Sequence, residues 1–201
     1  MEKYIKSYTK LFCDALSENR IPDTEDCARA YARRLKEMYS SEDFRSFNIY
    51  PTIDTYKVFA VIAMCLELSE YGFSDDEIID FINKVFRHLK RLFGALEKII
   101  DSLPCCYAVA KRWNLSDHAS RVKDGSIIYD TFTVEDSRIE YRISKCMYVE
   151  MFAHYGIRRL CKVFCISDEQ AYSNLTRHIK FIRHSDLSDG GSCHDEIIRV
   201  K

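Results

Sequence analysis

The sequence lacks a long apolar run and lacks an excess of charge of one sign. Its most apolar run, Val58 to Leu66, covers nine residues, about half of the ~20 that a helix needs to cross a bilayer. The first residues, Met1 to Lys6, lack the apolar stretch of a signal peptide. Thirty basic and thirty-one acidic residues leave a net charge of -1, which provides no field to attract nucleic acid or an anionic membrane. We therefore expect a cytoplasmic protein that binds neither.

The chain also lacks internal repeats, low-complexity segments, and the Cys-x-x-Cys or His-x-x-x-His pairs of common zinc sites. Nine cysteines are present. An odd number without a signal sequence favours reduced thiols over a disulfide framework. Cys13, Cys27 and Cys65 lie among apolar neighbours in helical patterns, and we interpret them as small core residues. Our predicted site therefore contains no metal ligand, and we expect no cofactor.

Residues 1–122 have the periodicity of helices. With 201 residues and 47% apolar content, the chain can bury a core as one large domain or as two closely packed subdomains. The stretch from Val58 to Leu68 is apolar around most of a helix circumference, which predicts the centre of a bundle. Apolar spacing and capping signals predict helices over about residues 3–16, 23–38, 51–70, 75–100 and 105–119.

The pattern changes after Gly125. Alternating apolar residues over 127–133 and 139–143, on either side of a turn at 135–137, predict a β-hairpin. Further on, the sequence predicts helices over 147–155 and 158–164, a short helix capped by Ser167 or Asp168, and strands over 179–182 and 196–200. We therefore predict an α+β fold. A helical bundle over residues 1–122 would pack on a small antiparallel sheet with helical insertions over 123–201, as one compact unit.

Cys146 stands where the second predicted strand gives way to a helix. Backbone N–H groups and the positive end of a helix dipole at such a position would lower the pKa of the thiol and favour the nucleophilic thiolate. Glu150, four residues on, would share that helix face. The alternative is that Cys146 only closes the corner between strand and helix by packing.

Two further segments offer reactive groups at the ends of elements. Cys165 is followed three residues later by Asp168, which could orient a base, activate water, or only cap a helix. Cys193, His194 and Asp195 follow two glycines. Because neighbouring residues of a strand point to opposite faces, Cys193 and Asp195 would share one side and His194 the other, unless the strand is bulged.

The segment from residue 141 to 195 resembles the L-2-amino-thiazoline-4-carboxylic acid hydrolase family. The resemblance rests on a basic residue before Cys146, an aromatic residue and Glu150 after it, Gly156, the Cys165-x-x-Asp168 spacing, Arg183, the pair Gly190-Gly191, and the ending Cys193-His194-Asp195. Before residue 141 the resemblance is weaker. His194 separates Cys193 from Asp195, where the family pattern has Cys and Asp adjacent, so either Cys193 or His194 occupies the usual cysteine position.

The resemblance implies a hydrolase that acts on a C–N bond of a small cyclic amidine, opening a thiazoline ring at its amidine-like carbon to give a carbamoyl-cysteine. Carried over by position, the catalytic residues are Cys146, Asp168, Cys193 and His194, and the substrate-binding residues are Glu150, Cys165, Arg183 and Asp195. In this mechanism the thiolate of Cys146 or Cys193 attacks the amidine carbon, and His194 or Asp168 moves the protons.

Two other classes of function stay open. The order of strands, helix, cysteine and C-terminal hairpin is also similar to that of vinyl-reductase-type domains, which would make the protein a non-catalytic binder of a small molecule. Alternatively, Cys146 or Cys165 could bind zinc together with Asp168, Cys193 and His194. For the hydrolase and for the non-catalytic binder, the expected partner is a small molecule. A homodimer is a further alternative, since tyrosine and phenylalanine are numerous.

Overall fold

The computed structural model describes residues 1–19, 21, 23–89 and 91–200, and for residues 88–93 no side chain is described. The chain divides into two compact units, Met1–Val85 and Phe86–Lys201. Among the described residues, no helix combines the length and the apolar composition that crossing a membrane requires.

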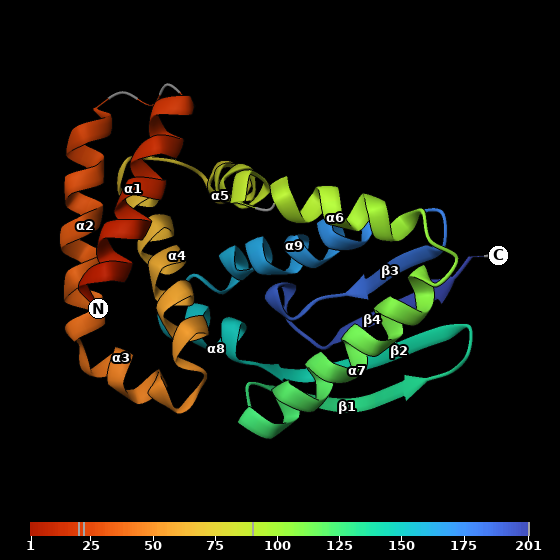
Figure 1. Cartoon of the computed structure of the whole chain (residues 1–201). Coiled ribbons are helices and arrows are strands. Elements are labelled where there is room, and N and C mark those ends of the chain that lie inside the picture. Colours follow the sequence, from red (N-terminus) through yellow and green to blue (C-terminus); the bar gives the residue numbers. More distant parts are fainter. Residues whose placement is uncertain (20, 22, 90, 201) are drawn as a thin grey trace. The chain divides into compact units, whose positions relative to one another are not determined.

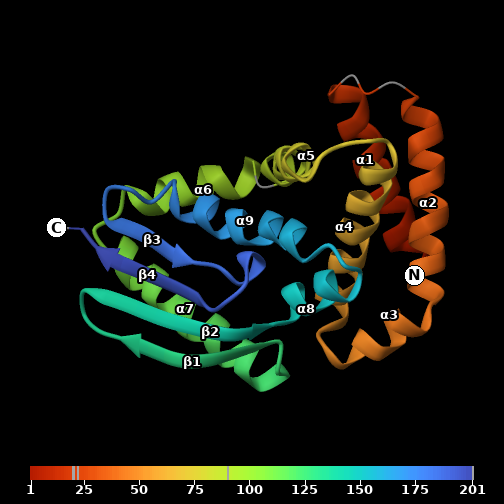
Figure 2. The same cartoon turned by 180° about the vertical axis from the view of Figure 1, so that it is seen from behind.

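The first unit is helical. Its elements are α1 (Glu2–Glu18), α2 (Thr24–Ser40), α3 (Glu42–Ser46), the 3-10 turn η1 (Phe47–Ile49), α4 (Thr52–Glu70) and most of α5 (Asp75–Leu89). Helices α1, α2 and α4 lie side by side (Figures 1 and 2). The segment of α4 from Val58 to Cys65 is buried without interruption, which confirms that this helix forms the centre of the bundle. Gly72 lies just after the C-terminal end of α4. Its φ of +86° is in the left-handed region that favours glycine.

The second unit contains the sheet. After the end of α5 its elements are α6 (Arg91–Asp101), α7 (Cys106–Asp124), β1 (Ile127–Val134), β2 (Arg138–Cys146), α8 (Met147–His154), η2 (Arg158–Cys161), α9 (Lys162–Tyr172), β3 (Ile179–Ser185), η3 (Leu187–Asp189) and β4 (Cys193–Arg199). The strands form one antiparallel sheet in the order β1-β2-β4-β3. The C-terminal strand β4 therefore lies in the middle, between β2 and the edge strand β3 (Figure 1).

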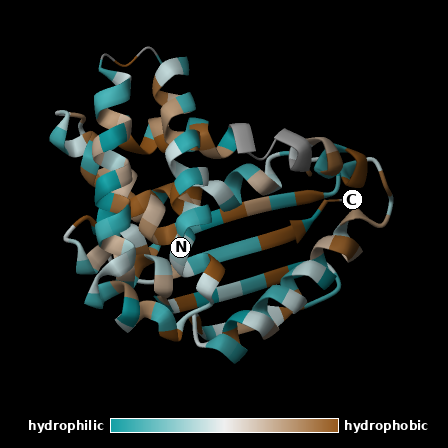
Figure 3. Cartoon of the chain, turned by 60° about the vertical axis from the view of Figure 1, so that its left-hand side comes forward, coloured by the Kyte–Doolittle hydropathy of each residue, from teal (hydrophilic) through white to brown (hydrophobic). Residues whose placement is uncertain are grey.

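The two faces of this sheet differ in polarity because successive side chains of a strand point to opposite sides. Ile139, Ile179 and Ile197 are buried in one cluster with residues of α7. We call this face, which also carries Arg183 and Asp195, the inner face. The opposite or outer face carries Glu140, His184, His194 and Glu196. Figure 3 shows the resulting alternation of hydrophobic and hydrophilic residues along the strands.

The α+β class and the antiparallel sheet are confirmed, and so is the predicted hairpin, which forms β1 and β2. The division at residue 122 stays a prediction, although every strand of the described residues lies after residue 126. The prediction of a new helix at Ser167 or Asp168 was wrong. Residues Lys162–Tyr172 form one helix, α9, because no glycine or proline interrupts it and its buried residues Val163 and Phe164 hold it in place. Within the predicted helix over 75–100, the described residues form α5 and α6, and residue 90 lies outside the described part of the chain.

Candidate functional site

The centre of the candidate site is a buried ion pair on the inner face. Strand β3 places Arg183 directly opposite Asp195 of β4. The guanidinium donates through Nε to Oδ1 of Asp195 at 2.9 Å and through Nη2 to Oδ2 at 2.7 Å. The two side chains are 10% and 1% exposed. Burial opposes the charge of Arg183, but Asp195 holds the pKa of the guanidinium far above the ordinary value, so Arg183 stays charged in this bidentate pair.

Helix α9 supplies further partners for the same guanidinium. Cys165, Asp168, Glu169 and Tyr172 recur at the spacing that places them on one helix face. Nη1 of Arg183 donates to the carbonyl oxygen of Cys165 at 2.5 Å and lies 3.6 Å from Oε1 of Glu169. Nη2 lies 3.5 Å from Oδ2 of Asp168. Three carboxylates thus surround one cation, and the cluster is negatively charged when all four groups are ionised.

Two thiols near this cluster, Cys146 and Cys193, have raised pKa values. Desolvation raises the pKa of Cys146 to about 12, although the backbone N–H groups of Tyr148 and Val149 act in the opposite direction. The expectation that the helix start would give Cys146 a lowered pKa was therefore wrong, because burial outweighs the hydrogen bonds. Cys193 donates its S–H to Oδ2 of Asp195 at 3.5 Å. Burial, and then the charge of Asp195, raise the pKa of Cys193.

Cys161 adds a thiol that the sequence did not single out. It is buried at the start of α9, and a hydrogen bond with Cys165 together with burial raises its pKa well above the ordinary value. Cys146 and Cys165 lie near enough to Cys161 to affect its pKa. Cys165, Asp168, Arg183, Cys193 and Asp195 therefore lie together, with Cys146 and Cys161 near them. With their raised pKa values, Cys146, Cys161 and Cys193 are better placed as neutral neighbours of the carboxylates than as ready nucleophiles.

Three further residues expected at the site have the following surroundings. His194 faces the outer side of the sheet, as the alternation along β4 predicted, and its Nε2 lies 2.8 Å from Oε1 of Glu140. Because it is on the opposite face from Cys193 and Asp195, it is not placed to exchange protons with the thiols. Glu150, on α8, forms an ion pair of 3.2 Å with Lys145. Asp168 lies inside α9 rather than at a helix start, so its alternative role as a cap was wrong.

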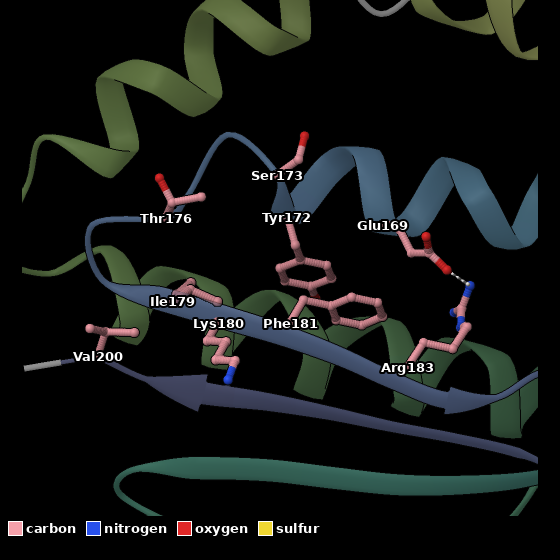
Figure 4. A pocket seen from close by; sticks show the side chains of 9 residues that line it. All are labelled: Glu169, Tyr172, Ser173, Thr176, Ile179, Lys180, Phe181, Arg183 and Val200. Carbon is pink, nitrogen blue, oxygen red and sulfur yellow. Dashed lines mark ion pairs between the residues drawn. The ribbon is translucent and has the colours of Figure 1, made fainter.

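A depression of about 530 Å³ lies beside this cluster, between α9 and the edge strand β3 (Figure 4). At one end Glu169 approaches Arg183, and Figure 4 marks this ion pair. In the middle, the rings of Tyr172 and Phe181 stack with their centres 4.8 Å apart and their planes 2° from parallel. Sequence analysis missed Glu169 and Tyr172. Treating residues 162–172 as one helix would have indicated both, since they share a face with Cys165 and Asp168.

Tyrosine hydroxyls complete the surroundings. Tyr141, on the inner face, has a pKa raised well above the ordinary value, first by burial and then by the charge of Asp195. Burial likewise raises the pKa of Tyr172, although a hydrogen bond with Asn114 acts against it. Nδ2 of Asn114 donates to the Tyr172 hydroxyl at 2.9 Å. Both phenols therefore stay protonated and remain hydrogen-bond donors beside the carboxylates.

In the described part of the chain, one group has the spacing of metal ligands. It consists of His184, His194 and Glu196, whose ligand atoms all lie within 4.8 Å of one another. This group is on the outer face, and it shares only His194 with the ligand set of the zinc alternative. The inner cluster holds sulfur and carboxylate groups in another arrangement, with Arg183 at its centre.

Comparison with known proteins identifies the family of this chain. Residues 56–195 match the family described as L-2-amino-thiazoline-4-carboxylic acid hydrolase. No curated protein and no solved structure matches the chain. The matched segment covers well over half of the 201 residues and includes the whole inner-face cluster from Cys146 to Asp195. At the family level this supports a hydrolase-type function. The chain belongs to the L-2-amino-thiazoline-4-carboxylic acid hydrolase family.

Proposed function

We propose that this protein hydrolyses a small cyclic amidine of the 2-amino-thiazoline type at the cluster around Arg183. The observation that carries the proposal is the set of three carboxylates around one buried guanidinium, beside a depression large enough for a small ring. An amidine that has bound a proton is a planar cation with N–H donors on both nitrogens. A negatively charged site favours such a cation, and one carboxylate can accept from both nitrogens at once.

The depression offers a place for the amidinium and for the ring of the substrate. Glu169, 48% exposed at the end of the depression, would accept hydrogen bonds from the amidinium. The stacked rings of Tyr172 and Phe181 would pack against the apolar part of the thiazoline ring. Arg183 and Asp195 would be positioning residues, because their buried ion pair holds the guanidinium that orients both Asp168 and Glu169.

Asp168 is the proposed general base. Its side chain is 60% exposed, so water reaches it, and its carboxylate is held near Arg183 on the face of α9 that carries Glu169. A carboxylate in this position can take a proton from water as the oxygen attacks the amidine carbon. The alternative attack by Cys146 needs a thiolate, which a pKa of about 12 makes rare at neutral pH. We therefore favour attack by water over a covalent intermediate.

The bond that breaks follows from the product. In a carbamoyl-cysteine the former amidine carbon keeps both nitrogens and gains an oxygen, so the ring opens by cleavage of the carbon–sulfur bond. This differs from the C–N bond expected from the sequence. Water adds through oxygen to the amidine carbon, the C=N electron pair moves to the ring nitrogen, and collapse of the adduct expels sulfur. One proton of the water ends on the ring nitrogen and the other on the sulfur, with Asp168 as the carrier.

The test is turnover of L-2-amino-thiazoline-4-carboxylate by the purified protein. The product carries a new thiol, which is measured after the protein has been removed by ultrafiltration. The mass of the product exceeds that of the substrate by one water. Asp168→Asn is expected to lower kcat by ~10²–10⁴-fold, the usual contribution of a general base. Glu169→Gln is expected to raise KM by ~10–100-fold, the value of a hydrogen bond to a charged group. Asp136→Asn, in the exposed hairpin turn, is the matched control and should change neither constant.

Three results would contradict parts of this proposal. Full activity of Asp168→Asn removes the assignment of the base. Loss of turnover in a folded Cys146→Ser variant restores the covalent route. Saturable binding of the substrate without any product, measured by calorimetry, would indicate a binding domain of the vinyl-reductase type instead of an enzyme.

A further inference from the structure

The outer face of the sheet gathers two histidines and two glutamates from three strands. His184 comes from β3, His194 and Glu196 from β4, and Glu140 from β2. The pairing of β3 with β4 shifts between Arg183 and Ser185, so His184 lies at a bulge. The register that pairs Arg183 with Asp195 brings His184 beside His194, and the two rings stack with centres 4.4 Å apart.

The ligand atoms of His184, His194 and Glu196 all lie within 4.8 Å of one another, which fits one small metal ion, and Glu140 lies next to one of them. Nε2 of His184 lies 3.1 Å from Oε1 of Glu196, and Nε2 of His194 lies 3.9 Å from the same oxygen. Nε2 of His194 lies 2.8 Å from Oε1 of Glu140. In a tetrahedral zinc site with bonds of ~2.0–2.1 Å, neighbouring ligand atoms are ~3.3–3.4 Å apart. The observed separations fall on both sides of that value, so small side-chain rotations would equalise them.

The electrostatic setting also suits a cation. Glu140 and Glu196 are directly opposite each other on neighbouring strands, an arrangement that is unfavourable for two like charges. Arg138 lies between them, with Nη2 2.7 Å from Oε2 of Glu140 and 2.8 Å from Oε1 of Glu196. Partial desolvation works against ionisation of Glu196, but hydrogen bonds from His184 and Arg138 hold its pKa below the ordinary value.

Arg138 and a metal ion can share these carboxylates. Glu140 already presents one oxygen to Arg138 and the other to His194. Arg138 is 42% exposed, so it has room to shift its contact with Glu196 to the second oxygen. In that arrangement each glutamate would offer one oxygen to the metal and one to the arginine, which would orient the ligands from the outer shell.

We propose that His184, His194 and Glu196, with Glu140 as the fourth ligand, bind one zinc-type divalent transition metal ion on the outer face of the sheet. Imidazole nitrogens select such ions over magnesium and calcium. Four protein ligands close the coordination sphere, so the site is structural and ties β3 and β2 to the central strand β4. It lies on the opposite face from the proposed catalytic cluster and does not depend on that proposal.

Metal binding to the purified, chelator-treated full chain tests the proposal. Equilibrium dialysis against Zn²⁺, with the metal content measured by mass spectrometry, should give one ion per chain. His184→Ala and His194→Ala should each raise the Kd by at least ~10–100-fold, since even the loss of an outer-shell partner costs that much. His178→Ala, a histidine outside the cluster and before β3, is the matched control and should leave the Kd unchanged.

Because nine cysteines could also bind zinc, Co²⁺ provides the second readout. A site made of nitrogen and oxygen gives weak visible bands, whereas thiolate ligands give an intense charge-transfer band in the near ultraviolet. Weak bands in the wild type that disappear in His184→Ala support the proposal. No binding, binding that survives both histidine substitutions, or a strong thiolate band would overturn it. His184 is 44% exposed, so its replacement leaves the fold intact, which circular dichroism checks.

Discussion

The two faces of the sheet hold similar charged groups in opposite settings. On the inner face, Asp195 and Arg183 form a bidentate pair with side chains 1% and 10% exposed. On the outer face, Glu196 meets His184 and Arg138, which are 44% and 42% exposed. Asp195 and Glu196 are consecutive residues of β4 and point to the inner and the outer face. The difference indicates that the burial of the partner, rather than the type of ion pair, decides how much the pair contributes to the free energy of unfolding.

Asp195→Asn should have the largest effect on stability. It removes the one buried carboxylate that pairs with Arg183 and leaves only the exposed Asp168 and Glu169, at 3.5 and 3.6 Å. The loss of one partner of a buried ion pair costs ~3–5 kcal/mol. The measurement is urea unfolding followed by the fluorescence of Trp113, which lies in α7 of the same unit and is the only tryptophan of the chain.

The double variant Arg183→Met with Asp195→Asn separates two explanations of that loss. If the unpaired charge is the cause, removal of the guanidinium should recover part of the stability. A double variant as unstable as the single one would instead assign the loss to packing. If Asp195→Asn lowers the free energy of unfolding by less than ~1 kcal/mol, the inner pair contributes no more than an exposed ion pair does. The contrast between the two faces would then be wrong.

Cys146→Ala should show a smaller effect that depends on pH. The folded-state pKa of Cys146 is raised from 9.0 to about 12, so between these values the unfolded chain loses a proton that the folded chain keeps. The stabilisation from this thiol is complete below pH 9 and decreases as the pH rises toward 12, by up to ~1.4 kcal/mol per pH unit. The variant lacks this thiol, so the free energies of unfolding of wild type and variant should converge between pH 9 and pH 10.5 in urea titrations. A constant difference would show that Cys146 is not desolvated.

The alternation along the C-terminal strand could be predicted from the sequence, and it correctly places Cys193 and Asp195 on one face and His194 on the other. The association of His184 with His194 could not be predicted. It depends on the register in which β3 pairs with β4, with Arg183 opposite Asp195, and a sequence alone does not give that register. Pairing across distant segments is set by the packing of the whole sheet.

The pKa of Cys146 shows a second limit of sequence reasoning. Its position before α8 was predicted, and the N–H groups of Tyr148 and Val149 do act on the thiol as expected. Desolvation has the opposite effect and is larger. Hydrogen bonds at a helix start are local and can be read from a sequence, whereas desolvation depends on segments that meet only in the folded chain. Glu169 was missed for the same reason. Its proposed role depends on its ion pair with Arg183, which lies on a different element, β3.

Glu196→Gln should have the smallest effect and is the closest counterpart of Asp195→Asn, since it makes the same chemical change one position along β4. With a chelator present, the loss of stability should be well below that of Asp195→Asn, because the exposed partners His184 and Arg138 regain their water shell when the charge is removed. With Zn²⁺ present, the wild type should melt at a higher temperature and the variant should not, since a ligand that binds only the folded chain stabilises it. Scanning calorimetry with and without Zn²⁺ measures both. An equal loss in the two variants under the chelator would show that the outer pair is as critical as the inner one, and the distinction between the faces would then fail.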